Sequence, residues 1–179
     1  MHGIVTVLAE PHHERVESIW RKLKQRFGVG RPEATSVPHF SYHVAPTYDI
    51  EQLKVVLVET AVTTPPFTVQ ATGIGIFPGE LPVLYIPVAR TPALQALHTA
   101  LWPKLEAVSQ DSLDYYAPNN WFPHITLGHN DITPAQLGPI VTWLNRQALA
   151  WDIQVTNLTL LHDPGGRHVP LHRAELQGN

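Results

Sequence analysis

The sequence predicts an α+β fold made of one duplicated, bilobal domain. We expect two antiparallel sheets with helices on the outside and a cleft between them. A pseudo-twofold axis should relate the two lobes. Three observations predict this architecture. Short strand-like segments alternate with short helices along the 179 residues, the last two predicted strands are adjacent, and two stretches of the chain repeat at almost the same offset. We therefore expect residues 1–179 to form a single two-lobed domain.

The first half of the chain shows both strand and helix patterns. Apolar residues at helical spacing end at a glycine after residue 27, and Asp49 is suited to cap a second helix. The predicted elements are, in order, a strand over 3–9, a helix over 12–27, a strand over 39–45, a helix after Asp49 and a glycine-interrupted strand over 65–77.

In the second half, two helices share the same start signal. Thr91-Pro92 and Thr133-Pro134 each combine an N-cap residue with proline at the first helical position, and Pro103 is expected to kink or end the first of these helices. The predicted strands are 82–89, expected to join the two halves, then 122–128, and a hairpin of 151–163 and 167–176 around the turn 163–166.

Composition narrows the functional classes. With 44% hydrophobic and 15% charged residues the chain has a globular composition, and a formal charge of −3 argues against broad capture of duplex nucleic acid, including duplex DNA. The absence of cysteine excludes disulfides and thiolate chemistry. We identify no signal peptide and no apolar run near the ~18 residues that a membrane span needs, so we expect a cytoplasmic protein.

An internal repeat relates the two halves. Residues 38–53 (PHFSYHVAPTYDIEQL) match 123–137 (PHITLGHNDITPAQL), with an offset of 85 between their first histidines. Residues 67–77 (FTVQATGIGIF) match 151–161 (WDIQVTNLTLL) at an offset of 84. Each copy thus contains a Pro-His-x-Ser/Thr strand followed by a helix, which predicts pseudo-symmetric lobes.

The repeated strands place polar groups on one face. Residues two apart in a strand share a face, so His39, Ser41 and His43 are expected to point together, as are His124 and Thr126. Pseudo-twofold symmetry would bring the two faces together across a groove. Two histidines with pKa values of ~6.5 suit acid–base catalysis at neutral pH. Hydroxyls can donate hydrogen bonds to anionic oxygens. The pattern therefore favours a phosphodiester as the substrate.

The paired His-x-Ser/Thr motifs resemble the two-histidine phosphoesterase superfamily, and within it the 2′-5′ RNA ligase / RNA 2′,3′-cyclic phosphodiesterase group, over most of the chain. The resemblance implies metal-independent hydrolysis of 2′,3′-cyclic phosphates in RNA processing, without cofactor, and the reverse ligation. It implies that His39 and His124 are catalytic and that Ser41 and Thr126 bind phosphate. We favour His124 as the base that activates water and His39 as the acid that protonates the leaving oxygen, and the symmetry of the two motifs leaves the reverse assignment open. Ser41 replaces the commoner threonine, and Tyr42 replaces an aliphatic residue.

Several other residues are candidates for the cleft lining, each beside a plainer interpretation. His43 lines the cleft or is a bystander, Arg31 contacts phosphate or solvent, and Tyr115, Tyr116 and Trp121 stack on a base or anchor their loop. We expect His129 to be structural, and we expect no metal at His12-His13 or at residues 168–172.

We expect a monomer that acts on a small cyclic nucleotide or an RNA terminus, away from membranes. Two other functions compete with this one. The first is a non-catalytic module that binds a nucleotide or RNA end in the same cleft. The second is a histidine-based metal hydrolase, which is disfavoured because the repeat pairs each histidine with a hydroxyl and not with a carboxylate.

Overall fold

The computed structural model describes residues 1–32 and 36–178, and it confirms the predicted α+β fold class. The first half contains β1 (His2–Val7), α1 (His12–Phe27), β2 (His39–Ala45), β3 (Thr47–Tyr48), α3 (Ile50–Thr63), β4 (Phe67–Thr72) and β5 (Gly75–Phe77). The second half contains β6 (Val83–Pro87), α4 (Pro92–Glu106), β7 (Ser109–Gln110), the short 3₁₀ helix η1 (Asp114–Tyr116), β8 (His124–Gly128), α5 (Pro134–Leu144), β9 (Ala150–Val155), β10 (Asn157–His162) and β11 (Val169–Glu175).

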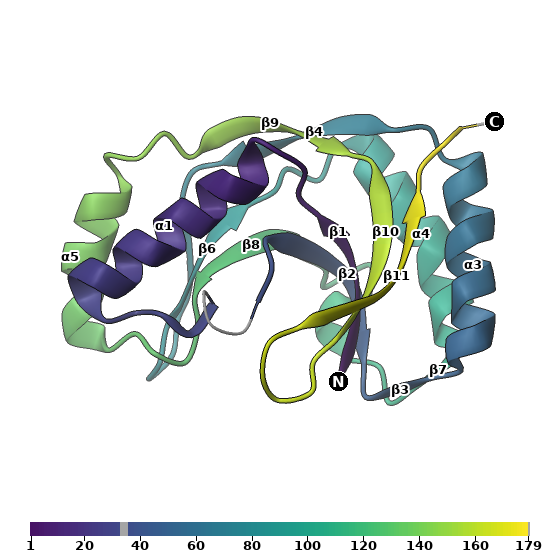
Figure 1. Ribbon diagram of the computed structural model, residues 1–179, viewed down its shortest axis with the longest axis horizontal. Coiled ribbons are helices and arrows are strands. Elements are labelled where there is room, and N and C mark those ends of the chain that lie inside the picture. The colour runs from purple at the N-terminus through teal and green to yellow at the C-terminus, as the bar shows by residue number, and fades with distance from the viewer. Residues whose placement is uncertain (33–35, 179) are drawn as a thin grey trace.

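Two antiparallel sheets form the two lobes. One has the strand order β11-β10-β1-β2 and the other has the order β5-β6-β8, with two further strand pairs, β3-β7 and β4-β9. In Figure 1, α3 and α4 lie beside the first sheet, whereas α1 and α5 lie at the opposite end of the molecule, near β6 and β8. Strands β2 and β8, which carry the two histidine motifs, meet in the middle between the lobes.

The pairing of β4 with β9 displays the pseudo-twofold relation. The sequence repeat aligns Val69 with Ile153 at an offset of 84, and these two residues are direct partners in the antiparallel β4–β9 ladder. A residue can pair antiparallel with its own repeat equivalent only when the symmetry axis passes between them. The halves also exchange strands, because β10 of the second half pairs with β1, and β5 of the first half pairs with β6.

Two sequence expectations about the strands are wrong. Residues 82–89 do not serve as a junction: β6 is the central strand of its sheet, between β5 and β8, just as β1 lies between β10 and β2. Residues 151–163 form two strands instead of one, which separate at Thr156 and enter different pairings, so only β10 makes the predicted hairpin with β11. Strand exchange between the lobes imposes both differences.

Side-chain caps start the helices where the sequence predicts them. The Asp49 carboxylate accepts from the Gln52 amide at 3.1 Å, and the Thr91 hydroxyl accepts from the Leu94 amide at 3.3 Å. The Gln136 side chain reaches back to the Thr133 amide at 2.9 Å, as in a capping box. Helix α4 does not end early, because it continues through Pro103 to Glu106.

The core is continuous through both lobes and beneath both motif strands. Phe40, Ile125 and Leu127 are fully buried on the core side of β2 and β8, which leaves the opposite side of these strands to face the space between the lobes. In β8 this pattern agrees with the expectation that His124 and Thr126 share the face away from the core. In the described ranges, no helix is long and apolar enough to cross a membrane.

Candidate active site

The two motif histidines are held by the same local hydrogen bond. The Nδ1 of His39 lies 2.7 Å from the carbonyl oxygen of Val37, and the Nδ1 of His124 lies 2.7 Å from that of Phe122. Because a carbonyl oxygen only accepts, each Nδ1 carries a proton and each neutral imidazole keeps an unprotonated Nε2. Both histidines are therefore presented in the tautomer whose Nε2 accepts a proton.

The residue before each histidine fixes this geometry. Pro38 and Pro123 are buried, and their carbonyl oxygens accept the amides of Leu8 at 2.9 Å and Val88 at 3.0 Å, residues that directly follow β1 and β6. Each proline is thereby tied to the end of an inner strand of its sheet. The carbonyl two residues before each histidine is held in place, and the imidazole with it.

Both histidine–hydroxyl pairs line one cavity between the lobes. Its volume is about 270 Å³, and His39, Ser41, His124 and Thr126 all contribute to its wall. A smaller extension of about 150 Å³ continues past His39 and Ser41 over β1 and β10. The cavity has room for a phosphodiester and part of a nucleoside, with each histidine beside a hydroxyl.

His43 does not share the face of His39 and Ser41, so its predicted place in the cleft is wrong. The β1–β2 register shifts between Ile4, opposite His43, and Val5, opposite Ser41, which makes Tyr42 an extra, bulged residue. The bulge turns His43 into the core, where it is fully buried and hydrogen-bonds Tyr48 at 2.5 Å and Glu106 at 2.9 Å.

The second motif contains an equivalent bulge. The β6–β8 register shifts between Leu84, opposite Gly128, and Tyr85, opposite Thr126, so that Leu127 is the extra residue. In both lobes the bulge thus immediately follows the hydroxyl residue. Its position ends the alternation of faces at Ser41 and at Thr126, which remain in the cavity wall.

Two tryptophans hold the backbone at these bulges. The indole Nε1 of Trp121 donates to the carbonyl of Ser41 at 2.8 Å, and that of Trp20 donates to the carbonyl of Thr126 at 3.0 Å. Trp121 is 1% exposed and stacks on His98 with ring centroids 3.8 Å apart. Of the two roles expected for Trp121, stacking on a base in the cleft is therefore wrong, and the buried anchor is confirmed: this ring supports strand β2 at Ser41.

The cavity depresses the basicity of both histidines. Burial, the dominant cause, lowers the pKa of His39 to about 4, partly offset by its bond to Val37, and His168 and His124 lower it further. Burial also lowers the pKa of His124, against its bond to Phe122. Both imidazoles are therefore neutral at pH 7 in the free protein. His124 affects the pKa of His39 because both residues face one cavity.

Two of the remaining candidates contribute to the cavity wall. Tyr116 and Arg31 line it, from η1 and from the segment after α1. Burial raises the pKa of Tyr116, and a side-chain hydrogen bond with Ser41 opposes the shift. Tyr116 is thus positioned to orient the Ser41 hydroxyl, and Arg31 brings a cation to the rim.

Tyr115 belongs to an aromatic cluster beside His124. Its ring centroid is 6.3 Å from that of His124, while Phe77 and Tyr85 lie at 5.0 and 5.2 Å from the same imidazole. Tyr115 is 41% exposed and Phe122 is 43% exposed, so the cluster has an open edge. Aromatic surface next to a phosphate site can stack against a nucleobase.

Sequence reasoning missed several parts of the wall. His168, in the β10–β11 connection, has its ring centroid 6.2 Å from that of His39 and its Nδ1 3.4 Å from the Ser36 hydroxyl. Asp163 and His129 also line the cavity, which corrects the expectation that His129 lies outside the site. No repeat or motif marks His168 and Asp163. They reach His39 only because β10 exchanges into the first sheet.

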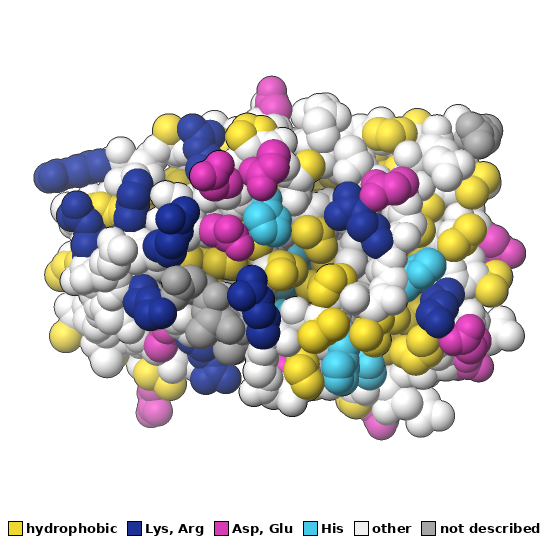
Figure 2. Space-filling model, viewed as in Figure 1, with side chains coloured by type: hydrophobic (Ala, Val, Ile, Leu, Met, Phe, Trp, Pro, Cys, Tyr) yellow, Lys and Arg dark blue, Asp and Glu magenta, His cyan; other side chains and the backbone are white. Residues whose placement is uncertain are grey.

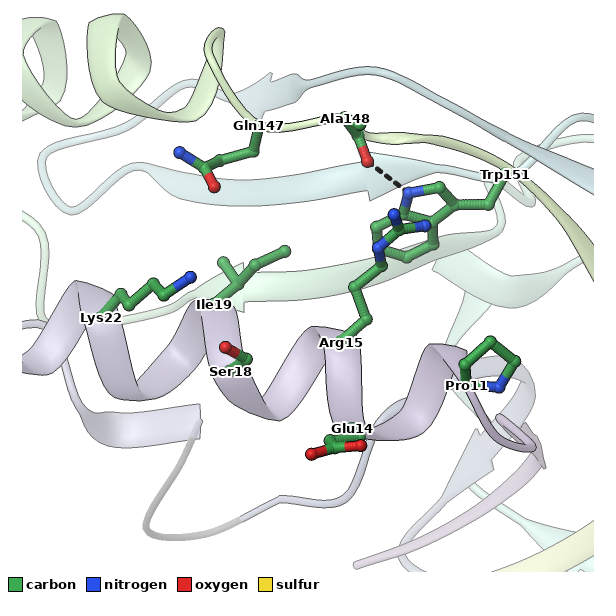
Figure 3. Close-up of a pocket in the computed structure, with 9 residues that line it drawn as sticks. All are labelled: Pro11, Glu14, Arg15, Ser18, Ile19, Lys22, Gln147, Ala148 and Trp151. Atoms are coloured by element: carbon green, nitrogen blue, oxygen red, sulfur yellow. Dashed lines mark hydrogen bonds between the residues drawn. The ribbon is translucent and has the colours of Figure 1, made fainter.

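A separate groove of about 350 Å³ lies between α1 and residues 147–151 (Figure 3). There the guanidinium of Arg15 lies 5.0 Å from the centre of the Trp151 ring, and the Trp151 indole donates to the carbonyl of Ala148. No histidine is among the residues that line this groove, whereas both motif histidines line the interlobe cavity. Among residues 1–32 and 36–178, no cluster of three or more His, Asp or Glu side chains is arranged to hold a metal ion.

Comparison with solved structures gives the same architecture at low sequence identity. The structure of TT0787 from Thermus thermophilus matches with a TM-score of 0.65 and 18% identity, covering 99% of this chain and 98% of that one. E. coli LigT complexed with NADP+ matches with a TM-score of 0.58 and 17% identity, and LigT complexed with 3′-AMP with 0.52 and 20%, each over 98% of this chain and 96% of the other. A comparison with curated proteins gives no match.

The family comparison covers nearly the whole chain. The model of the 2′-5′ RNA ligase superfamily matches residues 8–167, a range that contains both His-x-Ser/Thr strands and most of the cavity wall. The resemblance inferred from the two motifs is thereby confirmed, and membership supports a phosphoesterase- or ligase-type activity. The chain belongs to the 2′-5′ RNA ligase superfamily of two-histidine phosphoesterases.

Proposed function

We propose that this two-lobed domain is a metal-independent phosphodiesterase that hydrolyses a 2′,3′-cyclic phosphate at an RNA end or on a small nucleotide, and that it can run the reverse 2′-5′ ligation. The observation that carries the proposal is the pair of tautomer-fixed histidines, each beside a hydroxyl, in one cavity. The structures of E. coli LigT in complex with 3′-AMP and with NADP+ agree with a nucleotide-sized ligand.

The proposed reaction needs two proton transfers on opposite sides of phosphorus. One neutral imidazole Nε2 removes a proton from water while the new P–O bond forms. The bond from phosphorus to the 3′ oxygen breaks, and the other imidazole, protonated, gives its Nε2 proton to that oxygen. The product is a 2′-phosphomonoester with a free 3′-hydroxyl. Each positioned acid or base typically contributes ~10²–10⁴-fold to the rate.

The hydroxyls of Ser41 and Thr126 are proposed to donate to the non-bridging phosphate oxygens. They lie in the cavity wall on opposite lobes, one beside each histidine. Donors fixed in a partly enclosed site stabilise charge that grows on these oxygens in the transition state. The indole bonds to the backbone of both residues keep the two donors in register with the histidines.

The reaction also requires that one histidine becomes protonated when the phosphate binds. In the free protein the pKa of both imidazoles is lowered, that of His39 to about 4, so at pH 7 each ring is neutral and neither carries the second proton, on Nε2. A phosphodiester anion within a few ångströms favours the charged imidazolium and raises these pKa values. The negative charge of the bound substrate therefore raises the pKa of the histidine that acts as the acid, so that this histidine takes up a proton.

The function is tested by turnover of a nucleoside 2′,3′-cyclic phosphate in the presence of EDTA. The native protein should release the 2′-phosphate, and both His39→Ala and His124→Ala should reduce kcat by about 10²-fold or more. Tight binding without turnover would indicate the non-catalytic module instead. Loss of activity on adding EDTA would indicate a metal hydrolase, and full activity in either alanine variant would refute the site.

A change of leaving group separates the acid from the base. The sequence analysis favours His39 as the acid, whereas the strongly lowered pKa of His39 in the free protein favours the neutral, proton-accepting form there. A nucleoside 3′-(4-nitrophenyl phosphate) has a leaving group that departs without a proton. Only the variant that lacks the acid should regain activity on this substrate. Rescue of His39→Ala supports the first assignment, and rescue of His124→Ala supports the second.

A further inference from the structure

The charges of this acidic chain are distributed unevenly. Residues 18–32 contain Arg21, Lys22, Lys24, Arg26 and Arg31 and no Asp or Glu, so this segment carries +5 while the remainder of the chain carries −8. We call these five side chains the basic helix surface. All five residues are exposed, four of them on the second half of α1. In Figure 2 the dark-blue side chains crowd over the end of the molecule where Figure 1 places α1.

The basic helix surface is continuous with the mouth of the interlobe cavity. After α1 ends, the backbone amides of Gly30 and Arg31 donate to the Asp131 carboxylate at 2.9 and 2.7 Å, which holds this segment against the residues that follow β8. Arg31 then lines the cavity that contains both histidines. At 1.5 Å per residue, the cations from Arg21 to Arg26 lie within about two helical turns of this rim.

The helix that carries these cations is fixed to the rest of the lobe. Val16, Ile19 and Leu23 of α1 are buried, and the Gln136 side chain donates to the carbonyl of Phe27 at 2.8 Å. The guanidinium of Arg26 lies 5.8 Å from the centre of the Trp143 ring on α5. The surface is therefore a preformed array of cations.

Helix stability explains only part of this array. Lys24 and Arg26, in the last turn, interact favourably with the negative end of the helix dipole, but Arg21 and Lys22 lie before that turn. Lys22 also borders the groove between α1 and residues 147–151, into which Figure 3 shows its side chain extending. The surface lacks the exposed apolar residues that an interfacial membrane helix uses, because the apolar face of α1 is in the core.

We propose that the basic helix surface binds the phosphates of a single-stranded RNA whose 3′ end enters the cavity. This inference rests on the proposed function, which places a terminal phosphodiester at His39 and His124. Contacts from a row of Lys and Arg to a nucleic-acid backbone are sequence-independent and sensitive to salt. The substrate class is then an oligonucleotide with a cyclic phosphate end, and a free cyclic nucleotide uses only the cavity.

The test compares two substrates in two triple variants. Arg21→Gln, Lys22→Gln and Arg26→Gln combined remove three cations from the surface. Lys54→Gln, Lys104→Gln and Arg173→Gln combined remove three from the other lobe, giving the same change in net charge. Each protein is assayed with a nucleoside 2′,3′-cyclic phosphate and with a short oligoribonucleotide that ends in the same group.

The surface variant should lose on the order of tenfold in kcat/KM for the oligoribonucleotide at low salt and keep its rate on the mononucleotide. The slope of log kcat/KM against log salt should become shallower by about 2, since single strands release ~0.7 counterion per contact. The control variant should match the native protein. Equal loss in both variants, or an unchanged oligoribonucleotide rate in the surface variant, overturns the proposal.

Two further measurements distinguish failure of this proposal from failure of the proposed function, and RNA binding from membrane binding. If the native protein turns over neither substrate, the proposed function fails, while fluorescence anisotropy of the labelled oligoribonucleotide still tests the surface by its salt-dependent affinity and the difference between the two variants. Vesicles that contain phosphatidylserine are offered to the native protein in parallel. Binding to these vesicles that the surface variant loses, without RNA binding, would assign the surface to membranes and refute the proposal.

Discussion

His39 donates its Nδ1 proton to the carbonyl oxygen of Val37 across 2.7 Å, and this bond leaves Nε2 as the nitrogen available to a ligand. The same bond recurs at His124 in the other lobe. A buried proline separates donor and acceptor in both copies. The repeat thus reproduces a particular tautomer as well as a residue type, and the predictions below follow from that arrangement.

The hydroxyl residues should affect catalysis more than stability. Ser41→Ala and Thr126→Ala each remove one donor from the cavity wall, and each is expected to lower kcat by about 10²–10³-fold. Ser41→Thr keeps the hydroxyl and should retain most of the activity. Steady-state kinetics with a nucleoside 2′,3′-cyclic phosphate check both results. An inactive Ser41→Thr variant beside an active Ser41→Ala variant would show that the hydroxyl does not matter.

The pH dependence should have an acidic optimum. The pKa of His39 is lowered to about 4 and that of His124 is lowered below 6.5, mainly by burial. The plot of kcat/KM against pH reports the free protein and needs one neutral and one protonated imidazole. It should therefore fall on the alkaline side as the acid loses its proton and peak below pH 6.5. A maximum above pH 7.5 would contradict the burial of these rings.

The buried indoles should control both the stability and the position of the hydroxyl residues. Trp121→Phe leaves the carbonyl of Ser41 without its donor, at a cost of about 1–3 kcal/mol in the free energy of unfolding, and should lower kcat. Trp20→Phe is the matched change for Thr126. Urea unfolding and kinetics on the same samples provide the measurement. A catalytic loss with unchanged stability would point to direct substrate contact by Trp121 instead.

His43 should behave as a core residue. His43→Ala removes the partner of Tyr48 and Glu106 in a fully buried position, so the free energy of unfolding should fall by about 2 kcal/mol or more. The values of kcat and KM should stay within about twofold of native at temperatures where the variant is folded. His39→Ala should show the opposite pattern. A large catalytic defect in a folded His43→Ala protein would place His43 back in the cleft.

The candidate site could be predicted from sequence to the extent that its residues repeat. His39, Ser41, His124 and Thr126 share a motif, a strand and a following helix, and the structure places all four on one cavity. The predicted face of His43 is wrong because side chains stop alternating regularly between the two faces of a strand at a bulge. Nothing in the sequence around Tyr42 distinguishes a bulged residue from a regular one. The role of Trp121 stays open in the sequence between two alternatives, because a loop tryptophan packs equally well on a base or under a strand.

The sequence predicts the fold class, but it does not predict the order of the strands in the two sheets. Helix starts at Asp49, Thr91 and Thr133 follow from local capping chemistry. The exchange of β5 and β10 between lobes depends on long-range pairing, for which the sequence has no local signal. That exchange is what brings His168 and Asp163 beside His39.

The central claim is that both histidines face one phosphate, and nitrogen NMR of the imidazoles tests it most directly. In the free protein, ¹⁵N shifts should show His39 and His124 as Nδ1-protonated neutral rings with lowered pKa values. Adding a nucleoside 2′-monophosphate should raise the pKa of both together. If only one ring responds, or neither does, the two histidine–hydroxyl faces do not share a ligand and the account is wrong.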